Sequence, residues 1–432
     1  MTDIYEIAEY TLEALKKSGA DAAQCIVSKS KKDELNVDGG KFSLMRSTFN
    51  TSISMKAIKD GKKGVTSINQ ATKEAIDEAA DQCISAAQSS VPDEAEQIAS
   101  FTAKAEYKTG VFEPELDKLF DRIEEFMSQT AAEYPKIILE QLISDYEHSE
   151  KLYMNTNGTS LKYEHGEYSF NTMFSAHEGE KASSFNGYFC ALNSLDKPFM
   201  DAGMQRQLLV ESEKQLDTVS PSEKFVGRVI YSPDCFNELL QTALENFASS
   251  GVLIDGTSPW KDALNTKVAS EKLNLRSVPL DGRTVVGQRF TSDGYPVEDM
   301  DIIIDGVLKT FILSQYGANK TGFPRSLNSG NNLEVLPGNK ALEEMISGID
   351  RGLIVNRFSG GQPSSNGDFS GVAKNSFLIE NGKVVSAVSE TMISGNIIDM
   401  LNNIVAVSKE QTTDGLSFMP WAEFDGVTVS GK

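Results

Sequence analysis

The N-terminal part of the chain alternates between helical and strand-like spacing of its apolar residues. Ile4–Lys16 places apolar side chains three or four residues apart, which predicts an amphipathic helix, and Ala71–Ser89 repeats the pattern. Residues 1–106 are expected to form an N-terminal α+β domain that ends in a polar connector, Val91–Glu106. Alternating, β-branched stretches bounded by Asp-Gly turns predict the strands of this domain at Gln24–Ser30, Phe42–Phe49 and Thr51–Lys56.

A second unit of helices and strands is predicted for residues 107–224. Glu115–Tyr134 and Lys197–Leu216 have helical spacing, and Asn157-Gly158 is a strong signal for a β-hairpin. The polar stretch Asp217–Lys224 marks the expected end of this middle α+β domain. Its predicted strands are Lys136–Ser144, Glu150–Met154, Ser160–Ser175 and Ser184–Ala191.

The last part of the chain, residues 225–432, is rich in turn signals. It holds eight of the chain's twelve Asn-Gly and Asp-Gly pairs, with short apolar runs between them. This pattern predicts a turn-rich, mainly antiparallel β domain with a few helices, among them Pro233–Phe247 and Ile397–Asn403. The fold class expected for the whole chain is therefore α+β.

The charge balance argues against nucleic acid as a direct partner. The 432 residues include 62 acidic and 41 basic side chains, which gives a net charge of −21. Proteins that bind the nucleic-acid backbone depend on clustered Lys and Arg. Here the densest basic clusters, Lys29–Lys32 and Lys59–Lys63, lie beside acidic residues. We interpret them as solvated surface and expect no direct nucleic-acid binding.

Cysteine usage and the N-terminus bear on the cellular compartment. The four cysteines, Cys25, Cys83, Cys190 and Cys235, form no CxxC pair, which fits a reducing environment. Met1–Lys17 contains four acidic residues and no apolar core, which is unlike a signal peptide. No stretch approaches the roughly 20 apolar residues of a membrane span. We therefore expect a soluble cytoplasmic protein that does not bind a membrane.

Histidines with neighbouring carboxylates are candidates for a metal or catalytic site. His148 and His165 lie in similar strings, Tyr-Glu-His-Ser-Glu and Tyr-Glu-His-Gly-Glu, and His177 follows twelve residues later. Helical zinc motifs need histidines four or five residues apart, whereas these are 17 and 12 apart in strand-like sequence. Surface histidines on a charged sheet face are the favoured interpretation.

The polar loop Ser359–Gly371 offers a second candidate site. It contains neither a phosphate-binding GxxxxGK[ST] motif nor a GxSxG nucleophile elbow. Its glycines serve tight turns in the favoured interpretation, but glycine also lets a peptide backbone approach closely. On that second interpretation the candidate residues of a peptide channel are Gly360, Gly361, Asn366 and Gly367.

Several strings in the C-terminal third carry a family resemblance. They include Gly371–Gly382, Ile393–Asn396 followed by Asn403–Val407, Asp305–Thr310, and the closing Asp425–Gly431. Taken together they resemble the TldD/PmbA proteins, once called modulators of DNA gyrase. The match extends more loosely to the N-terminal strands. The resemblance therefore covers essentially the whole chain.

The resemblance implies a chain without the family's zinc site. TldD-type members carry HExxxH on a helix, whose histidines and a distant C-terminal cysteine hold zinc while the glutamate activates water. Laid on this chain, the motif falls on Gln241, Thr242 and Asn246, and no cysteine follows Cys235. These three residues can equally be the polar face of a helix. The resemblance implies a PmbA/TldE-type subunit with no catalytic residue, no cofactor and no metal, and with zinc in a TldD-like partner.

Three functions remain open on the sequence. The first is a non-catalytic subunit, in a heterodimer with a TldD-like zinc peptidase, that helps cleave unfolded peptides such as a leader peptide or an antitoxin. The resemblance implies an active site in a closed chamber between the two subunits. The second is a self-sufficient homodimeric peptidase with an unidentified site, for which the three histidines are the candidates. The third is a non-enzymatic modulator of DNA gyrase.

Overall fold

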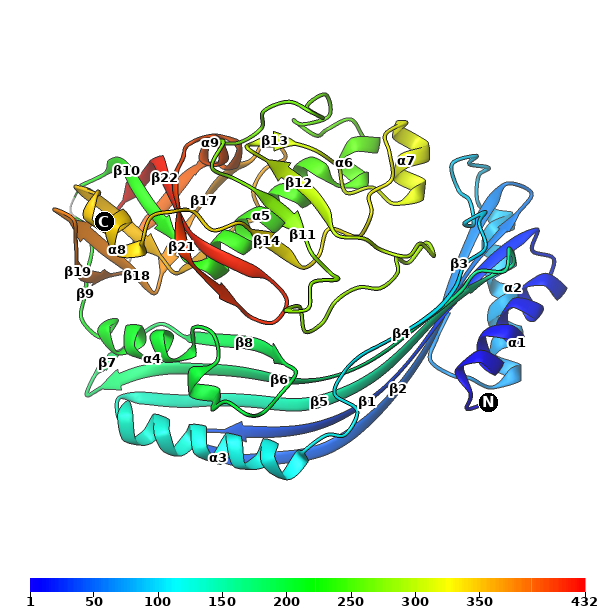
Figure 1. Ribbon diagram of the computed structural model, residues 1–432, viewed down its shortest axis with the longest axis horizontal. Coiled ribbons are helices and arrows are strands. Elements are labelled where there is room, and N and C mark those ends of the chain that lie inside the picture. Colours follow the sequence, from blue (N-terminus) through cyan, green and yellow to red (C-terminus); the bar gives the residue numbers. More distant parts are fainter. Residues whose placement is uncertain (222, 390, 432) are drawn as a thin grey trace.

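The computed structural model describes residues 1–221, 223–389 and 391–431; Lys432, the end of the third expected domain, lies outside them. Within this part of the chain the strands form two sheets, one of eight strands and one of fourteen. Figure 1 shows the first sheet curving beneath a C-terminal domain built on the second. The α+β fold class predicted from the sequence is confirmed by helices packed on large, mainly antiparallel sheets.

The first sheet is built from unusually long strands. Its order is β3-β2-β1-β5-β6-β4, with β7 and β8 also paired to β6. The sequence predicted two strands in place of β2 and two in place of β5, because polar stretches interrupt the alternation there. Pairing continues through those stretches. The strands are β1 Ala22–Asp38, β2 Lys41–Lys59, β3 Lys62–Ile68, β4 Lys104–Gly110, β5 Ile137–Asn155, β6 Ser160–Glu178, β7 Lys181–Ala182 and β8 Asn186–Leu192.

This sheet runs across the N-terminal and middle units that the sequence analysis divides at residue 106. The expected boundary falls inside β4, and β1 of the first unit pairs with β5 of the second along 15 residue pairs, Gln24–Asp38 with Gln141–Asn155. The strands on either side of residue 106 therefore belong to the same sheet. A continuous hydrogen-bonded ladder joins the two units instead.

Helices cover only one face of the first sheet, at its two ends. Cys25 and Val27 of β1 pack in the core formed with α1 (Ile4–Lys17) and α2 (Lys73–Ser89). Leu35 and Val37 of the same strand pack in the core with α3 (Leu116–Glu133). All four are odd-numbered, so they point to one face, because successive side chains of a strand alternate. We call this the helix-covered face.

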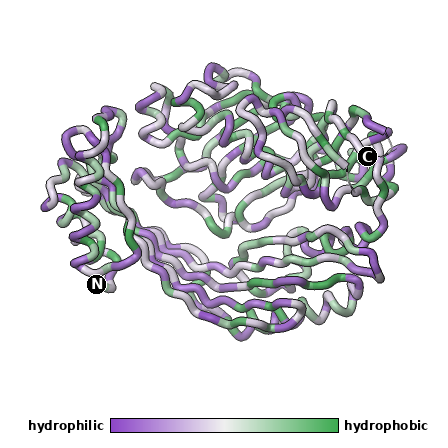
Figure 2. Tube along the Cα trace, turned by 180° about the vertical axis from the view of Figure 1, so that it is seen from behind, coloured by the Kyte–Doolittle hydropathy of each residue, from purple (hydrophilic) through white to green (hydrophobic). Residues whose placement is uncertain are grey.

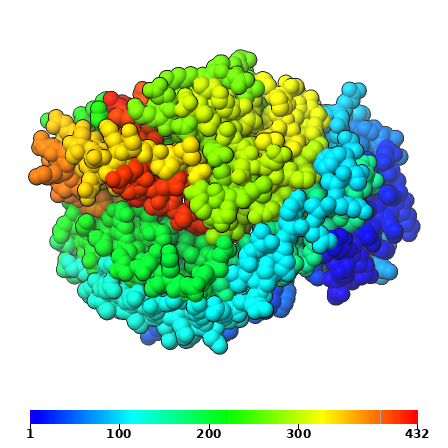
Figure 3. All heavy atoms as spheres, in the orientation of Figure 1, coloured from blue at the N-terminus to red at the C-terminus, as the bar shows by residue number. Residues whose placement is uncertain are grey.

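The opposite, concave face looks toward the C-terminal domain. Gln24, an even-numbered residue of β1, donates from Nε2 to the carbonyl of Ser292 at 3.1 Å, so the two parts of the molecule touch there. Figure 2 shows that the middle of the long strands is largely hydrophilic. Figure 3 shows side chains closing much of the gap between the two parts on the face in view.

The expected helix Lys197–Leu216 is broken in two. A 3-10 turn, η1 (Phe199–Asp201), precedes α4 (Gln205–Lys214), and Gly203 separates them with φ of +45°. A Cβ at Gly203 would lie 1.8 Å from the Tyr188 hydroxyl. Glycine is required here because the backbone is left-handed and the neighbouring strand leaves no room for a side chain.

The C-terminal domain wraps its sheet around helix α5 (Pro233–Ala248). Phe236, Leu240 and Phe247 of α5 share one core with Val229 of β10 and Val429 of β22. The helices α6, α7 and α8, of five to seven residues each, have no counterpart among the predicted elements. The other bounds are α6 Ser250–Ile254, α7 Gln315–Thr321, α8 Leu342–Ser347 and α9 Ile397–Asn402.

The strands of this second sheet are short and mainly antiparallel. Its main path is β13-β12-β11-β14-β22-β10-β15-β18-β19-β9, with β16, β17, β20 and β21 attached at the side. No helix in the described residues is long and apolar enough to cross a membrane. The strands are β9 Thr218–Val219, β10 Phe225–Tyr231, β11 Leu275–Ser277, β12 Met300–Ile304, β13 Val307–Leu308, β14 Leu333–Val335, β15 Arg351–Val355, β16 Arg357–Gly360, β17 Asp368–Lys374, β18 Ser376–Glu380, β19 Lys383–Val388, β20 Met392–Asn396, β21 Ile404–Thr413 and β22 Phe418–Ser430.

Candidate functional site

Helix α5 stands between the C-terminal core and a set of cavities. Ser232 caps its start by accepting a hydrogen bond from the Cys235 amide at 3.4 Å, and Pro233 occupies the first turn, where its missing N–H costs nothing. One side of the helix is buried in the core, while Gln241 and Glu245 on another side are exposed. The exposed side opens toward the concave face of the first sheet.

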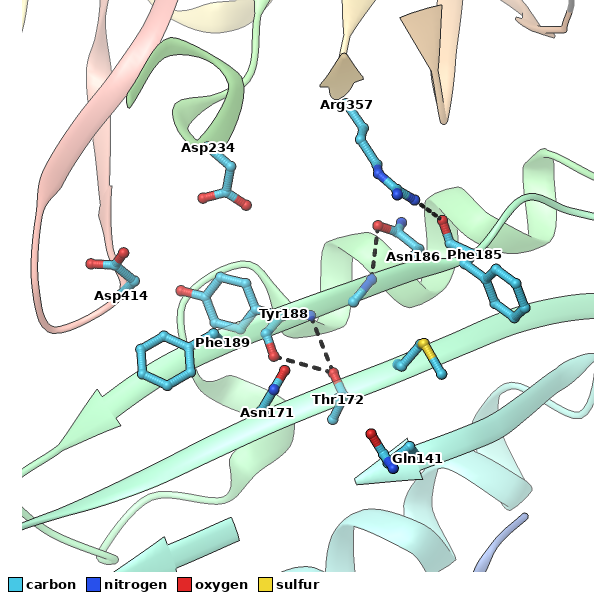
Figure 4. Close-up of a pocket in the computed structure, with 12 residues that line it drawn as sticks. Gln141, Asn171, Thr172, Phe185, Asn186, Tyr188, Phe189, Asp234, Arg357 and Asp414 are labelled. Atoms are coloured by element: carbon cyan, nitrogen blue, oxygen red, sulfur yellow. Dashed lines mark hydrogen bonds between the residues drawn. The ribbon is translucent and has the colours of Figure 1, made fainter. Parts of the chain in front are cut away.

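The first cavity, of about 510 Å³, lies at the N-terminal end of α5 (Figure 4). Asp234 from α5, Asp414 from the β21–β22 turn and Arg357 from β16 line one side, and strands β6 and β8 line the other. Arg357 donates from Nη1 to the carbonyl of Phe185 at 2.9 Å, which fastens β16 to the first sheet. The cavity therefore lies between the two parts of the molecule.

Two carboxylates face this cavity from the C-terminal domain. Asp414 accepts hydrogen bonds from the amides of Leu416 and Ser417, at 2.8 and 2.7 Å. The Asp234 side chain opens into the cavity but is ringed by protein, and this burial together with the charge of Asp414 raises the pKa of Asp234 to about 6. Nothing in the sequence pattern indicates that Asp234, an acidic residue in the first turn of a helix, lines a cavity.

A second cavity, of about 260 Å³, separates α5 from the loop that follows β16. Thr242 and Glu238 line it from the helix, and Gly360 and Gly361 line it from the loop. The structure thus brings together one residue of the family motif position and two of the four candidate channel residues. Among the described strands, β16 pairs only with β17, so its other edge is free of strand partners; there the Phe358 amide is hydrogen-bonded to the Cys235 thiol.

The other two candidate channel residues have a structural role in the described geometry. Asn366 Nδ2 donates to the Asp368 carboxylate at 2.9 Å, and its carbonyl accepts from Asn396 Nδ2 at 2.9 Å. Gly367 has φ of +92°, and a Cβ there would lie 2.9 Å from the Phe247 ring. These residues form a tight turn packed against the end of α5.

A third cavity, of about 770 Å³, lies on the other flank of α5. Gln241 and Glu245 line it from the helix, Asp414 and Ser417 from the β21–β22 turn, and Lys151 from the concave face of the first sheet. Gln241 and Thr242 therefore open to different flanks of the helix. Asn246, one turn farther along, is half-buried.

The three histidines do not share a site. In the register of β1, β5 and β6, His148 is opposite Lys31 and lies on the helix-covered face, where its Nε2 is 3.0 Å from Glu164. His165 is opposite Ser149 and lies buried on the concave face, with Nδ1 2.8 Å from the Thr109 hydroxyl. His177 is near the end of β6, twelve residues on, or about 40 Å along the strand. Its Nε2 is 2.9 Å from the Ser175 hydroxyl.

A buried carboxyl group stands beside His165 on the concave face. Glu167 Oε2 lies 3.1 Å from His165 Nε2, although the two atoms are not aligned as a hydrogen bond. Burial, together with the charges of Glu147 and Asp145, raises the pKa of Glu167 to about 7. Burial lowers the pKa of His165. Burial therefore favours the neutral form of both groups.

Comparisons with known proteins place this geometry in a family. Residues 224–431 match the model of the PmbA/TldA metallopeptidase C-terminal domain, and residues 23–87 match the model of PmbA/TldA metallopeptidase domain 1. Together the two ranges cover more than half of the chain. The chain belongs to the PmbA/TldD family.

Curated relatives carry names of the same family. Metalloprotease PmbA of Escherichia coli O157:H7 is 32% identical over 155 residues, which are 35% of this chain and 34% of that protein. A metalloprotease PmbA homolog of Buchnera aphidicola is 25% identical over 283 residues, which are 61% of this chain and 62% of that protein. The matched part of the chain thus spans less than two thirds of the length of either relative.

Solved structures share the fold over the full length. TldE from Thermococcus kodakarensis has a TM-score of 0.81 at 22% identity, covering 98% of this chain and 100% of that one. A Bacteroides thetaiotaomicron protein that carries the name of a candidate modulator of DNA gyrase has a TM-score of 0.84 at 23% identity, with both chains fully covered. At these identities the likeness shows the PmbA/TldD fold alone.

The residues at the family's motif position do not fit a zinc ion. The side chains of Gln241 and Asn246 end in amides, and Thr242 carries a hydroxyl, whereas structural and catalytic zinc sites use His, Cys and carboxylate ligands. Within the described residues, no three His, Cys, Asp or Glu side chains lie close enough together to hold a metal ion. The motif position of this PmbA/TldD-family chain therefore offers no set of zinc ligands.

We expect Glu167→Gln to stabilise the protein in a pH-dependent way. The raised pKa of Glu167 means that ionising it costs folding free energy, which is fully felt above about pH 7 and absent below about pH 4.3. The variant should gain about 2 kcal/mol near pH 8 and under about 1 kcal/mol near pH 4.5. Urea unfolding midpoints at the two pH values measure the difference.

Glu164→Gln is the matched control on the opposite face. Burial alone would raise the pKa of Glu164, but hydrogen bonds from His148 and Lys108 lower it overall. Ionised Glu164 therefore adds stability above its unfolded pKa, and this stability is lost as the pH falls through its folded pKa. The control should be destabilised near pH 8, opposite in sign to Glu167→Gln. A pH-independent change in the Glu167 variant would contradict the assignment.

Proposed function

We propose that this chain is the metal-free, non-catalytic PmbA/TldE-type subunit of a TldD/TldE-like zinc peptidase. In this proposal a TldD-like subunit supplies the zinc, and the present chain supplies one wall of the chamber that holds an unfolded peptide. The observation that carries it is helix α5, whose Gln241 and Thr242 face peptide-sized cavities without forming a metal site. The relatives' names, metalloprotease PmbA and TldE, support the same assignment.

The free edge of β16 supports binding of an extended peptide. Phe358 is paired with Ala373 of β17, and the Ala373 amide donates away from β16, to Thr391, at 2.9 Å. The amide and carbonyl of Phe358 therefore point away from β17, as alternate residues of a strand do. The amide is hydrogen-bonded to the Cys235 thiol of α5, which leaves the carbonyl for a peptide. A peptide strand added at such an edge is held by backbone hydrogen bonds, which gives little sequence preference. This suits a peptidase that acts on unfolded chains.

Zinc content and mixing test the assignment directly. The purified chain, dialysed without chelator, should contain less than about 0.1 zinc per chain by elemental mass spectrometry, since amide side chains are poor zinc ligands. Adding it to a TldD-like partner should raise cleavage of an unstructured peptide at least about tenfold over the partner alone. One tightly held zinc per chain, or no gain on mixing, would overturn the proposal.

A bulky residue at Gly361 should block the second cavity. No atom outside the neighbouring residues lies within 4 Å of a Cβ built at Gly361, and its backbone is not left-handed, so a side chain fits without strain. Gly361→Trp should cut the mixed complex's peptide cleavage at least about tenfold while leaving thermal stability within about 0.5 kcal/mol. The same cleavage assay and a thermal melt provide both measurements.

Gly251→Trp is the matched control for this substitution. Gly251 lies on α6, is exposed, and has equally open space around its Cβ position. It should leave cleavage unchanged. Equal activity of the two variants would remove the second cavity from the peptide path.

A further inference from the structure

A fourth cavity, of about 370 Å³, lies between the concave face of the first sheet and the loop Gly287–Phe290. Lys151 of β5 and Arg289 of the loop line it, together with hydroxyl groups of the strands and two glutamates. Both glutamates have cationic partners of their own, Glu147 with Lys32 at 3.0 Å and Glu150 with Lys162 at 2.7 Å. Lys151, Gly287 and Gln288 also line the cavity of about 770 Å³ beside α5. The two cavities therefore meet at Lys151.

Lys151 has no anionic partner. Among the residues that the structure describes, its ammonium forms no ion pair and no hydrogen bond, and its one recorded contact is the Phe290 ring, 5.7 Å from Nζ to the ring centre. Burial lowers the pKa of Lys151. Lys162, on the neighbouring strand but on the opposite face, is paired with Glu150 at 2.7 Å. The chain has 21 more acidic than basic residues, so acidic side chains are plentiful. Lys151 nevertheless lines a cavity without an acidic partner in the described residues, although charges removed from water are normally paired.

Arg289 adds a second uncompensated cation to the same cavity. Its Nη1 donates to two backbone carbonyls, of Pro279 at 2.6 Å and Gln288 at 3.1 Å, and its guanidinium lies 5.5 Å from the Tyr163 ring centre. It meets no carboxylate in the described part of the chain. A Cβ at Gly287 would lie 2.9 Å from Arg289 Nη1, so this glycine leaves the space that the guanidinium occupies. The arginine is thus held in place by neutral groups, with its charge unneutralised.

Carboxylates line the neighbouring cavities but, among the residues described, form no ion pair with Lys151. Asp414 lines the 770 Å³ cavity together with Lys151, yet no ion pair joins them in the described structure. Asp414 also lines the first cavity, beside Asp234. The connected cavities therefore have a basic region at Lys151 and Arg289 and an acidic region at Asp234 and Asp414.

We propose that Lys151 and Arg289 form a carboxylate-binding subsite that receives an anionic group of the bound peptide. The carboxylate is supplied either by the C-terminus of the peptide or by an acidic side chain within it. The inference rests on the proposed function, since it assigns one end of the peptide path. An ammonium on the sheet and a guanidinium on the facing loop, with strand hydroxyls beside them, give a carboxylate charge-assisted hydrogen bonds that a neutral amide cannot match.

Peptide binding to the full chain tests the subsite. Four fluorescein-labelled hexapeptides of Gly, Ser and Ala serve as probes in fluorescence anisotropy: free acid, C-terminal amide, and the amide with one internal Glu or Gln. The free acid should bind about tenfold more tightly than its amide if the C-terminus is the ligand. The Glu peptide should bind about tenfold more tightly than the Gln peptide if a side chain is the ligand.

Two lysine variants test whether Lys151 causes this preference for the anionic peptide. Lys151→Met removes an unpaired, half-buried charge, so the variant is expected to fold, and it should abolish the preference for the anionic peptide. Lys162→Met makes the same change in net charge on the helix-covered face and should leave the preference intact. Equal binding of all four peptides, or a preference that survives Lys151→Met, overturns the subsite and leaves peptide binding by the chain standing.

A second measurement distinguishes failure of the carboxylate subsite from failure of the proposed peptide-binding function. If no peptide binds, ¹³C-dimethylated lysines are followed by NMR, with the Lys151 signal assigned by its loss in Lys151→Met. A shift of that signal with acetate, and a weaker one with inorganic phosphate, supports a carboxylate site in a protein that is not a peptide channel. A response to phosphate alone, or to neither anion, overturns the carboxylate subsite.

Discussion

The hydrogen-bonded ladder of the four long strands β1, β2, β5 and β6 is the constraint on which the rest of the structure depends. Strands of 17 to 19 residues exceed the width that one pair of helices can cover. The helices therefore pack only at the two ends of one face, around separate apolar cores. The ladder itself holds these cores in one body, because its backbone hydrogen bonds continue through the polar middle.

The uncovered, concave face of this ladder becomes the floor of the cavities. Alternation places the even-numbered residues of β1 and the odd-numbered residues of β5 on it, so side chains distant in sequence share one surface. Lys32, for example, reaches Glu147 at 3.0 Å across this face. Opposite lies α5, whose core side fixes the helix and leaves its other flanks to the cavities. The space between the concave face and α5 thus exists because the sheet and the helix each bury only one side.

The sequence predicted elements better than it predicted their assembly. The bounds of α5 and α9 agree to within one residue with those expected, because capping residues and apolar spacing are local signals. The expected break within β5 fell at polar residues such as Glu147. Judged only by the alternation of apolar and polar residues, this stretch was predicted to interrupt the strand. In the sheet such a residue faces a cavity, so it needs neither a core nor a turn.

The candidate site shows the same limit. Thr242, Gly360 and Gly361 share a cavity, which their positions 118 residues apart gave no means to foresee. Asp234 and Lys151 gave no signal, since a lone acid at a helix N-terminus and a lone lysine in a strand are ordinary features. Only tertiary structure shows that each lines a cavity and has no partner of opposite charge in the described residues. The family strings identified the protein class, but the geometry had to identify the side chains.

Ion pairs occur on both faces of the first sheet, but the groups whose charges oppose folding lie on the cavity side. On the helix-covered face, carboxylates such as Glu164 and Glu150 have cationic partners within 3.3 Å, so their charges are compensated. On the cavity side, Glu167 and Asp234 have raised pKa values and Lys151 has a lowered one, so each charge opposes folding. A protein that needs only to fold gains nothing from such groups. Perturbed titrating groups gathered around cavities are typical of sites whose missing partner is a ligand.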